Sequence, residues 1–194
     1  MTNPQKTKGD RGEREAVLAL TRLAGDRVVE NPRRKLGAGR RDDMGDLDVL
    51  PGVTIQVKTM SDLSRALRSA ASGAMEQRER SGDDWALGMA PVPHARSKAV
   101  RWLAATEEWP GGEPDADCVA GFGMIAAAIS HARRENIGVP RYRRLAVVRR
   151  LGQPALYVAP LEAWVHDWCA SSSPPHCEGS RAALPKELAD AWRT

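Results

Sequence analysis

The sequence predicts an α/β fold in which a central mixed β-sheet is flanked by helices. Residues 10–24 carry apolar side chains at helical spacing, and residues 45–60 alternate polar and apolar side chains as paired strands do. A second amphipathic segment, residues 61–80, leads into an apolar strand at 85–90. This order predicts a β–α–β crossover between two parallel strands.

The chain has 194 residues, the length of one domain. We expect a single domain over residues 1–170, with a core at about 6–90 and 141–170 and an insertion at 91–140, followed by a linker and tail over 171–194. The remaining elements are expected as strands at 27–30 and 100–105, a helix at 119–136, a hairpin of 145–150 with 155–159, and a helix at 161–170.

Composition excludes several classes of protein. The chain has 3 cysteines, an odd number without the spacing of a disulfide framework, which favours a reducing compartment. No apolar run approaches the roughly 20 residues of a membrane-spanning helix, and the N-terminal residues lack an apolar signal segment. We therefore expect a cytoplasmic protein that does not enter a membrane.

Basic residues are clustered, although the net charge is only +4 from 29 basic and 25 acidic residues. One cluster, in residues 31–41, contains no acid, and a second, arginine-rich cluster lies in residues 133–150. Arginine forks suit phosphate oxygens, so this pattern favours a nucleic-acid partner over the alternative, ordinary solvated surface charge. The residues expected to contact DNA are Arg33, Arg34, Lys35, Arg40, Arg41, Arg141, Arg143 and Arg144.

The segment from Gly45 to Lys58 contains the candidate chemistry. In its second strand the side chains of Gln56 and Lys58 share one face, and Asp46, or alternatively Asp48, comes from the strand before. A carboxylate and a second oxygen ligand can hold Mg²⁺, which polarises a phosphoryl oxygen and lowers the pKa of its bound water. A lysine beside them can orient that water or stabilise charge on phosphorus.

This chemistry requires a particular strand register. Opposed residues of antiparallel strands point to the same face of a sheet. A two-residue turn at Pro51-Gly52 would pair Asp46 with Val57, on the wrong face, whereas a three-residue loop or a bulge would pair Asp46 with Gln56. The alternative is a plain hairpin whose polar side chains face water.

Glu13 is the second element of the candidate site. On a helix it begins the stripe formed by Val17, Leu20 and Ala24, and an inward carboxylate needs a partner such as a metal or its water. The alternative is a capping box, because Asp10-x-x-Glu13 also has the spacing of one.

Together these segments resemble the PD-(D/E)XK nuclease superfamily, and more narrowly the Holliday junction resolvases of archaea and bacteriophages. The resemblance covers about residues 6–60. It is carried by Lys8-Gly-Asp-Arg-Gly-Glu-Arg-Glu15, the basic loop Leu36-Gly-Ala-Gly-Arg-Arg41, then Gly45-Asp46 and Gln56-Val-Lys58.

The resemblance implies a restriction-endonuclease-like core and a catalytic set of Glu13, Asp46, Gln56 and Lys58. It also implies Mg²⁺, or Mn²⁺ in its place, held by Asp46, Gln56, the carbonyl of Val57, and Glu13 directly or through water. The sequence departs from the family pattern at Gln56, where most relatives have glutamate, so that one negative charge is absent.

The function so implied is a metal-dependent endonuclease for branched DNA, such as four-way junctions, working as a homodimer in the cytoplasm of a bacterium or a phage-infected bacterium. Alternatives are a related nuclease for ends, nicks or single strands, and a DNA-binding protein that has lost activity, which Gln56 would explain. No nucleotide cofactor is expected, because the glycine motif at 121–126 lacks a long preceding strand and an acid about 20 residues later.

Overall fold

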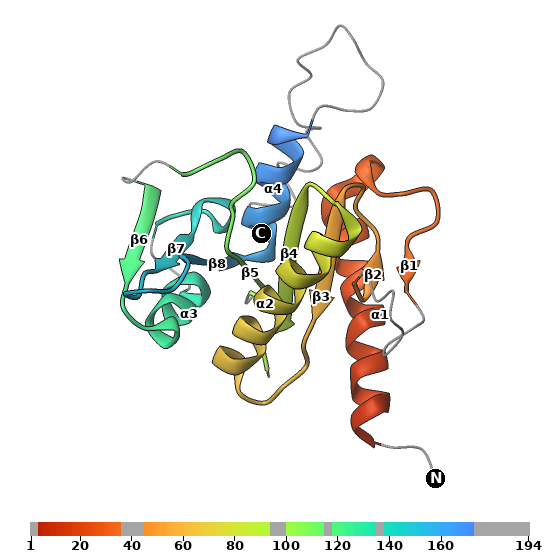
Figure 1. Ribbon diagram of the computed structural model, residues 1–194, viewed down its shortest axis with the longest axis horizontal. Coiled ribbons are helices and arrows are strands. Elements are labelled where there is room, and N and C mark those ends of the chain that lie inside the picture. The colour runs from red at the N-terminus through yellow and green to blue at the C-terminus, as the bar shows by residue number, and fades with distance from the viewer. Residues whose placement is uncertain (1–3, 36–44, 94–99, 115–117, 135–137, 173–194) are drawn as a thin grey trace, which may run out of the picture.

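The computed structural model describes residues 4–35, 45–93, 100–114, 118–134 and 138–172. The helices of this part of the chain are α1 (Pro4–Ala24), α2 (Leu63–Ser81), α3 (Ile125–Arg133) and α4 (Leu161–Ser171), with 3₁₀ turns η1 (Gly25–Arg27) and η3 (Arg141–Arg143) (Figure 1). Its strands are β1 (Arg33–Arg34), β2 (Leu47–Asp48), β3 (Val53–Val57), β4 (Trp85–Pro91), β5 (Trp102–Thr106), β6 (Val119–Phe122), β7 (Leu145–Val148) and β8 (Leu156–Pro160). None of these described helices combines the length and the apolar character needed to span a bilayer.

The described strands form one mixed sheet in the order β1-β2-β3-β4-β5-β8-β7-β6. β3 and β4 are parallel, and α2 forms the crossover between them, as the sequence predicts. β6 and β7 are also parallel, whereas the other neighbouring strands are antiparallel. The α/β class, with a mixed sheet and flanking helices, is therefore confirmed.

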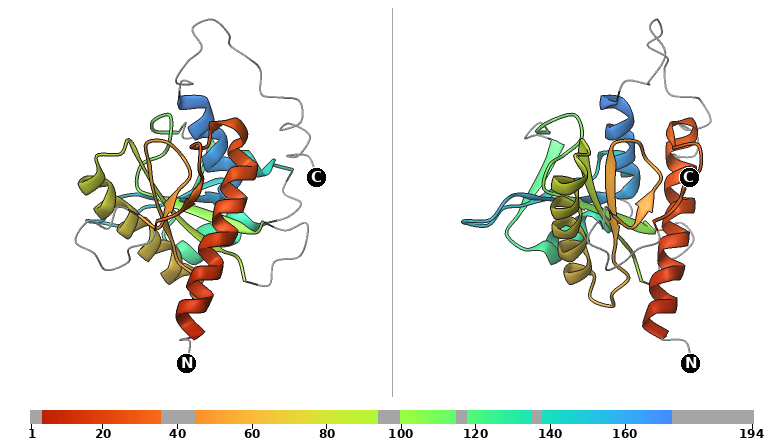
Figure 2. Two further views of the ribbon diagram at one scale, coloured as in Figure 1. Left: turned by 90° about the vertical axis from the view of Figure 1, so that its right-hand side faces the viewer. Right: turned by 45° about the vertical axis from the view of Figure 1, so that its right-hand side comes forward.

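Two helices cover each face of the sheet. Leu20 of α1 and Trp164 of α4 share a buried core with Ile55 of β3. Leu67 of α2 and Ile129 of α3 belong to a second core on the other face. Figure 2 (left) shows α2 on one side of the sheet and α1 with α4 on the opposite side. Because side chains alternate along β3, its odd-numbered residues face α1 and its even-numbered residues face α2.

Several predicted elements differ from those observed. The first helix begins at Pro4 rather than Asp10. The strand predicted at 27–30 is wrong. Arg27 ends η1, Val29 makes one backbone hydrogen bond to Val49 at 2.9 Å, and the ladder with β2 forms only at β1, after Pro32, which has no N–H to donate. The helix predicted at 119–136 is confirmed only in its later part, as α3, because its first residues form β6 beside β7 and α3 starts only after Gly123.

Residues 91–140, expected as an insertion, contribute structure to the same sheet as the predicted core. β5 pairs with β4 on one side and β8 on the other, so it lies in the middle of the sheet. β6 extends the far edge, and α3 covers the second core. The predicted hairpin and final helix are confirmed as β7, β8 and α4. Residues 173–194, the larger part of the predicted tail, lie outside the described residues.

α2 lies unusually close to the sheet at Gly88 of β4. A Cβ atom built on Gly88 would lie 2.3 Å from the backbone nitrogen of Ala71 and 2.5 Å from the carbonyl carbon of Ala70. These are helix backbone atoms, which cannot move aside as a flexible side chain can. Gly88 pairs with Gln56 of β3, so the same close approach brings α2 over the candidate site.

We expect Gly88→Ala to lower the free energy of unfolding by about 3 kcal/mol, because the added methyl group forces α2 away from the sheet. Urea unfolding followed by circular dichroism measures the change. The matched control is Gly121→Ala on β6, where a Cβ atom meets nothing within 4 Å and the loss should stay below about 1 kcal/mol. Equal losses in the two variants would contradict the close packing.

Candidate active site

The β2–β3 hairpin has the register that the candidate chemistry requires. Leu47 pairs with Ile55, and the N–H of Asp46 donates to the carbonyl of Ile55 at 2.8 Å. Asp46 and Leu47 thus both lie against Ile55, and the side chain of Asp46 reaches the side chain of Gln56. The connection is the three residues Leu50–Gly52, with Gly52 in the left-handed region at φ 67°, and not the two-residue turn that would have reversed the faces.

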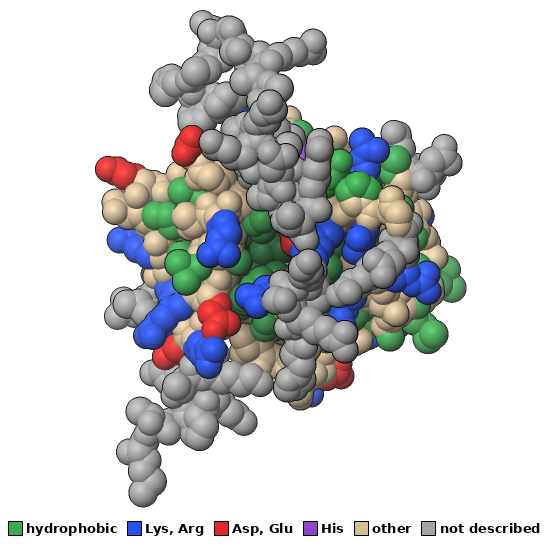
Figure 3. Space-filling model, turned by 180° about the vertical axis from the view of Figure 1, so that it is seen from behind, with side chains coloured by type: hydrophobic (Ala, Val, Ile, Leu, Met, Phe, Trp, Pro, Cys, Tyr) green, Lys and Arg blue, Asp and Glu red, His purple; other side chains and the backbone are tan. Residues whose placement is uncertain are grey.

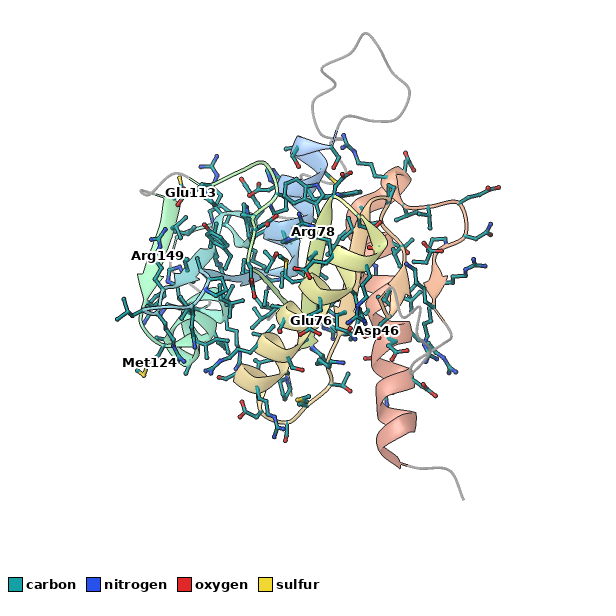
Figure 4. The ribbon with its side chains drawn as sticks, in the orientation of Figure 1. Asp46, Glu76, Arg78, Glu113, Met124 and Arg149 are labelled. Atoms are coloured by element: carbon teal, nitrogen blue, oxygen red, sulfur yellow. The ribbon has the colours of Figure 1, made fainter. Side chains whose placement is uncertain are left out.

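Asp46 and Gln56 are in direct contact. The side-chain amide of Gln56 donates from Nε2 to Oδ2 of Asp46, and the backbone N–H of Val57 donates to the same oxygen at 2.7 Å. Only 4% of Gln56 is exposed, because it lies beneath α2. Figure 4 shows Asp46 on the side of α2 that faces α1. The structure thus brings one carboxylate and one amide together at a nearly buried position.

Lys58 lies immediately beyond β3 on the same face as Gln56. Its backbone N–H donates to the carbonyl of Met89 at 3.1 Å, which continues the pairing of β3 with β4 by one residue. The alternation of the strand therefore extends to Lys58, which is half-buried. Its ammonium group is carried on a flexible stem at the end of the strand that holds Gln56.

Glu13 is held by an arginine of β1. Arg34 donates from Nε to Oε2 of Glu13 at 2.5 Å and from Nη2 to Oδ1 of Asp10 at 2.7 Å. Although burial lowers it, these hydrogen bonds and charges together raise the pKa of the Arg34 guanidinium. Because α1 begins at Pro4, Asp10 and Glu13 lie inside the helix and do not form the capping box considered as the alternative.

The carboxylate of Glu13 and the Asp46–Gln56 pair approach β3 from different faces. Arg34 pairs with Leu47, whose buried side chain belongs to the core under α1, whereas Gln56 lies against α2. The structure therefore joins Asp46 with Gln56 and Glu13 with Arg34 as two separate groups. Just beyond β3, a Cβ atom built on Gly12 of α1 would lie 2.2 Å from Cγ2 of Thr59. α1 therefore contacts the chain one residue beyond Lys58.

The donor set at this position suits a hard divalent cation. Asp46 offers a carboxylate, Gln56 an amide oxygen, and Val57 a backbone carbonyl, all oxygen ligands of the kind that Mg²⁺ takes. Within the described ranges no group of three or more His, Cys, Asp and Glu side chains could hold a metal. A cation bound here would therefore depend on the amide and the carbonyl, with water completing its shell.

The expected DNA-binding residues have different environments. Arg33 is exposed, with its Nε 3.7 Å from Oδ2 of Asp48, whereas Arg34 is occupied by the two acids of α1. The backbone N–H of Lys35 donates to the carbonyl of Asp46 at 2.8 Å, which places Lys35 beside the site. Arg40 and Arg41 lie outside the described residues.

The second basic cluster contains structural as well as exposed arginines. Arg144 is buried and donates to the carbonyls of Val139 at 2.7 Å and Arg134 at 2.5 Å. Arg141 lies 3.5 Å from the carboxylate of Glu162. Arg143 is exposed, and its guanidinium carbon lies 5.7 Å from the centre of the Tyr142 ring. Of these three arginines, Arg143 is the one presented to solvent.

Sequence reasoning missed the partnership of Arg34 with Asp10 and Glu13. One sequence signal could have indicated it: Asp10 and Glu13 are spaced i and i+3, so they share one helix face, and an arginine follows on the next edge strand. It also missed the structural role of Arg144, which depends on two carbonyl groups from other segments and has no sequence signal.

The chain finds no match among models of known protein families, curated proteins or solved structures. Its likeness to PD-(D/E)XK nucleases therefore depends on the short motifs within residues 6–60. The start of α1, the Gly-Asp pair and the Gln-x-Lys strand fall within the described residues, whereas the basic loop Leu36–Arg41 does not.

We expect Arg34→Ala to lower the free energy of unfolding by about 2 kcal/mol, because it leaves two half-buried carboxylates without their shared cation. Arg33→Ala is the matched control on the neighbouring exposed side chain and should change it by less than about 0.5 kcal/mol. Thermal or urea unfolding of both variants measures the difference. Similar small losses would show that the Arg34 pairs contribute no more than a surface contact.

Proposed function

We propose that this protein is a metal-dependent DNA endonuclease related to the PD-(D/E)XK nucleases, acting on branched DNA such as four-way junctions. The observation that carries the proposal is the side-chain contact between Asp46 and Gln56, which the pairing of Leu47 with Ile55 accompanies. Lys58 follows on the same strand face. A plain solvent-facing hairpin would not bury its glutamine under a helix, as this one does.

Each residue has a role in the proposed reaction. A divalent cation, when bound, supplies polarisation of the phosphoryl group and activation of a water. Asp46, Gln56 and the carbonyl of Val57 would hold it, and Lys58 would stabilise charge that develops on the phosphate. Arg34 fixes the orientation of the Glu13 carboxylate, and we propose that this carboxylate positions a water for the reaction.

The proposed DNA surface includes both the site and η3. A row of paired residues crosses the sheet from Val57 of β3 through β4 and β5 to Ala159 of β8. The next strand, β7, pairs with β8 and starts just after η3. This row covers four strand spacings, about 19 Å along the sheet, which permits separate phosphate contacts at Lys58 and Arg143. From behind, the molecule is hollowed near its centre, with apolar side chains on the floor and Lys and Arg side chains around it (Figure 3).

Resolution of a junction requires two cuts related by approximate two-fold symmetry. We propose that a homodimer supplies the two sites. A fixed spacing between two such sites would explain a preference for branched DNA over linear duplex without any reading of base sequence, since phosphate contacts position the DNA but do not specify it.

The Asp46–Gln56 bond also favours a second candidate function. In the described structure the amide of Gln56 occupies the carboxylate that a cation would use. A DNA-binding protein that has lost cleavage activity would keep the basic surface and this closed pair. The two functions differ in one property, strand cleavage with Mg²⁺.

We expect Asp46→Asn and Lys58→Ala to abolish Mg²⁺-dependent cleavage, by at least about a hundredfold, while junction binding stays within threefold of wild type. Labelled four-way junction, linear duplex and single strands, each with Mg²⁺, measure cleavage and its preference. Asp48→Asn is the matched control, because Asp48 is the neighbouring acid of the same strand and faces Arg33.

Normal cleavage by both variants would show that the site is assigned wrongly, and loss of cleavage only in Asp48→Asn would move the acid to residue 48. Absence of cleavage by the wild-type protein, together with tight junction binding, would favour the inactive DNA-binding protein. Cleavage of ends or single strands in preference to junctions would favour a related nuclease.

We expect Arg143→Ala to weaken DNA binding regardless of sequence and to reduce the salt slope of binding by about 1, as loss of one phosphate contact does. Arg149→Ala is the matched control, because Arg149 follows the opposite end of β7 and lies 3.5 Å from Glu113. Fluorescence anisotropy at several salt concentrations measures both. An unchanged slope in Arg143→Ala would exclude η3 from the DNA surface.

A further inference from the structure

The Asp46–Gln56 contact has a defined polarity. An ionised carboxylate only accepts hydrogen bonds, so the amide of Gln56 must present its NH₂ group, and not its oxygen, to Asp46. The backbone N–H of Val57 donates to the same carboxylate oxygen. Oδ2 of Asp46 therefore accepts from two N–H donors, and a cation that binds this oxygen must displace at least one of them.

We propose that Gln56 is a metal-coupled amide switch: in the metal-free protein its NH₂ group closes the site, and binding of a divalent cation turns the amide over so that Oε1 faces the cation. This inference rests on the proposed function, because it concerns the same metal site. Rotation about the terminal side-chain torsion exchanges the oxygen and nitrogen atoms and leaves the rest of Gln56 in place.

The packing around Gln56 permits this rotation but not a larger movement. A Cβ atom built on Gly73 of α2 would lie 3.4 Å from Oε1 and 3.5 Å from Cγ of Gln56. The side chain therefore lies directly beneath the bare backbone of Gly73, and α2 itself is fixed by its close approach to Gly88. With its stem confined, Gln56 can reverse its amide only by turning in place.

The switch predicts a difference between glutamine and glutamate at this position. A glutamate has two equivalent oxygens and needs no reversal, and it adds a negative charge for the cation. We expect Gln56→Glu to bind Mg²⁺ at least about tenfold more tightly than wild type. In the absence of metal the variant should have a lower melting temperature than wild type, because two carboxylates then meet beneath α2.

The test is nuclear magnetic resonance of the ¹⁵N-labelled full-length chain during titration with Mg²⁺. Without metal, one NH₂ proton of Gln56 should resonate downfield of ordinary glutamines, because it is bonded to a carboxylate; it is identified by its absence in Gln56→Glu. With saturating Mg²⁺ that signal should return to the ordinary range. Gln77 of α2, which is also buried, is the internal control, and its side-chain amide signal should not shift on addition of Mg²⁺.

Isothermal calorimetry of the same samples separates the outcomes. Binding of Mg²⁺ that requires Asp46, with an unmoved Gln56 signal, would overturn the switch and leave the proposed nuclease intact. Two results together would support the switch: the downfield signal is absent in Asp46→Asn, and in wild type it moves to the ordinary range when Mg²⁺ binds. No measurable Mg²⁺ binding by wild type, with no metal-dependent cleavage, would overturn both the switch and the proposed function.

Discussion

The candidate site depends on the odd register of the β2–β3 hairpin. A one-residue slip of a strand exchanges its two faces, so the same sequence with a two-residue turn would point Asp46 away from Gln56. With the connection ending at Gly52, Leu47 instead pairs with Ile55, and the side chains of Asp46 and Gln56 are joined by a hydrogen bond. No property of either side chain alone could produce this contact.

The second constraint is the distance of α2 from the sheet. Gly88 lets the helix backbone approach β4, and its partner Gln56 on β3 is buried by the same approach. Burial removes competing water and strengthens the hydrogen bond to Asp46. The geometry of the site is therefore set by positions that carry no chemistry: a glycine on β4, a glycine on α2 and a glycine in the turn.

How far the sequence predicts the molecule differs between its parts. Periodicity found α2, β3, β4 and α4, because each is long or strongly patterned. It failed at β6, where four residues run into a glycine-bearing turn and the parallel partner β7 decides the conformation. It also failed at β1, whose pairing depends on β2. Arg34 and Arg144 were grouped with DNA-binding residues on charge alone. In the structure Arg34 donates to the acids of α1, and Arg144 donates to the carbonyls of Val139 and Arg134 in the segments just before it.

The glutamine at position 56 follows from the same constraints. A carboxylate at this buried position would meet the half-buried Asp46 beside α2, and two adjacent negative charges would repel each other where solvent screens them little. An amide removes that repulsion and replaces it with a hydrogen bond, so the hairpin and α2 can pack before any cation arrives. The consequence is a site with less charge for a cation. In the proposed metal site, glutamine would therefore favour the stability of the metal-free fold at the expense of metal affinity, and the burial of Gln56 under α2 is the physical reason for that exchange.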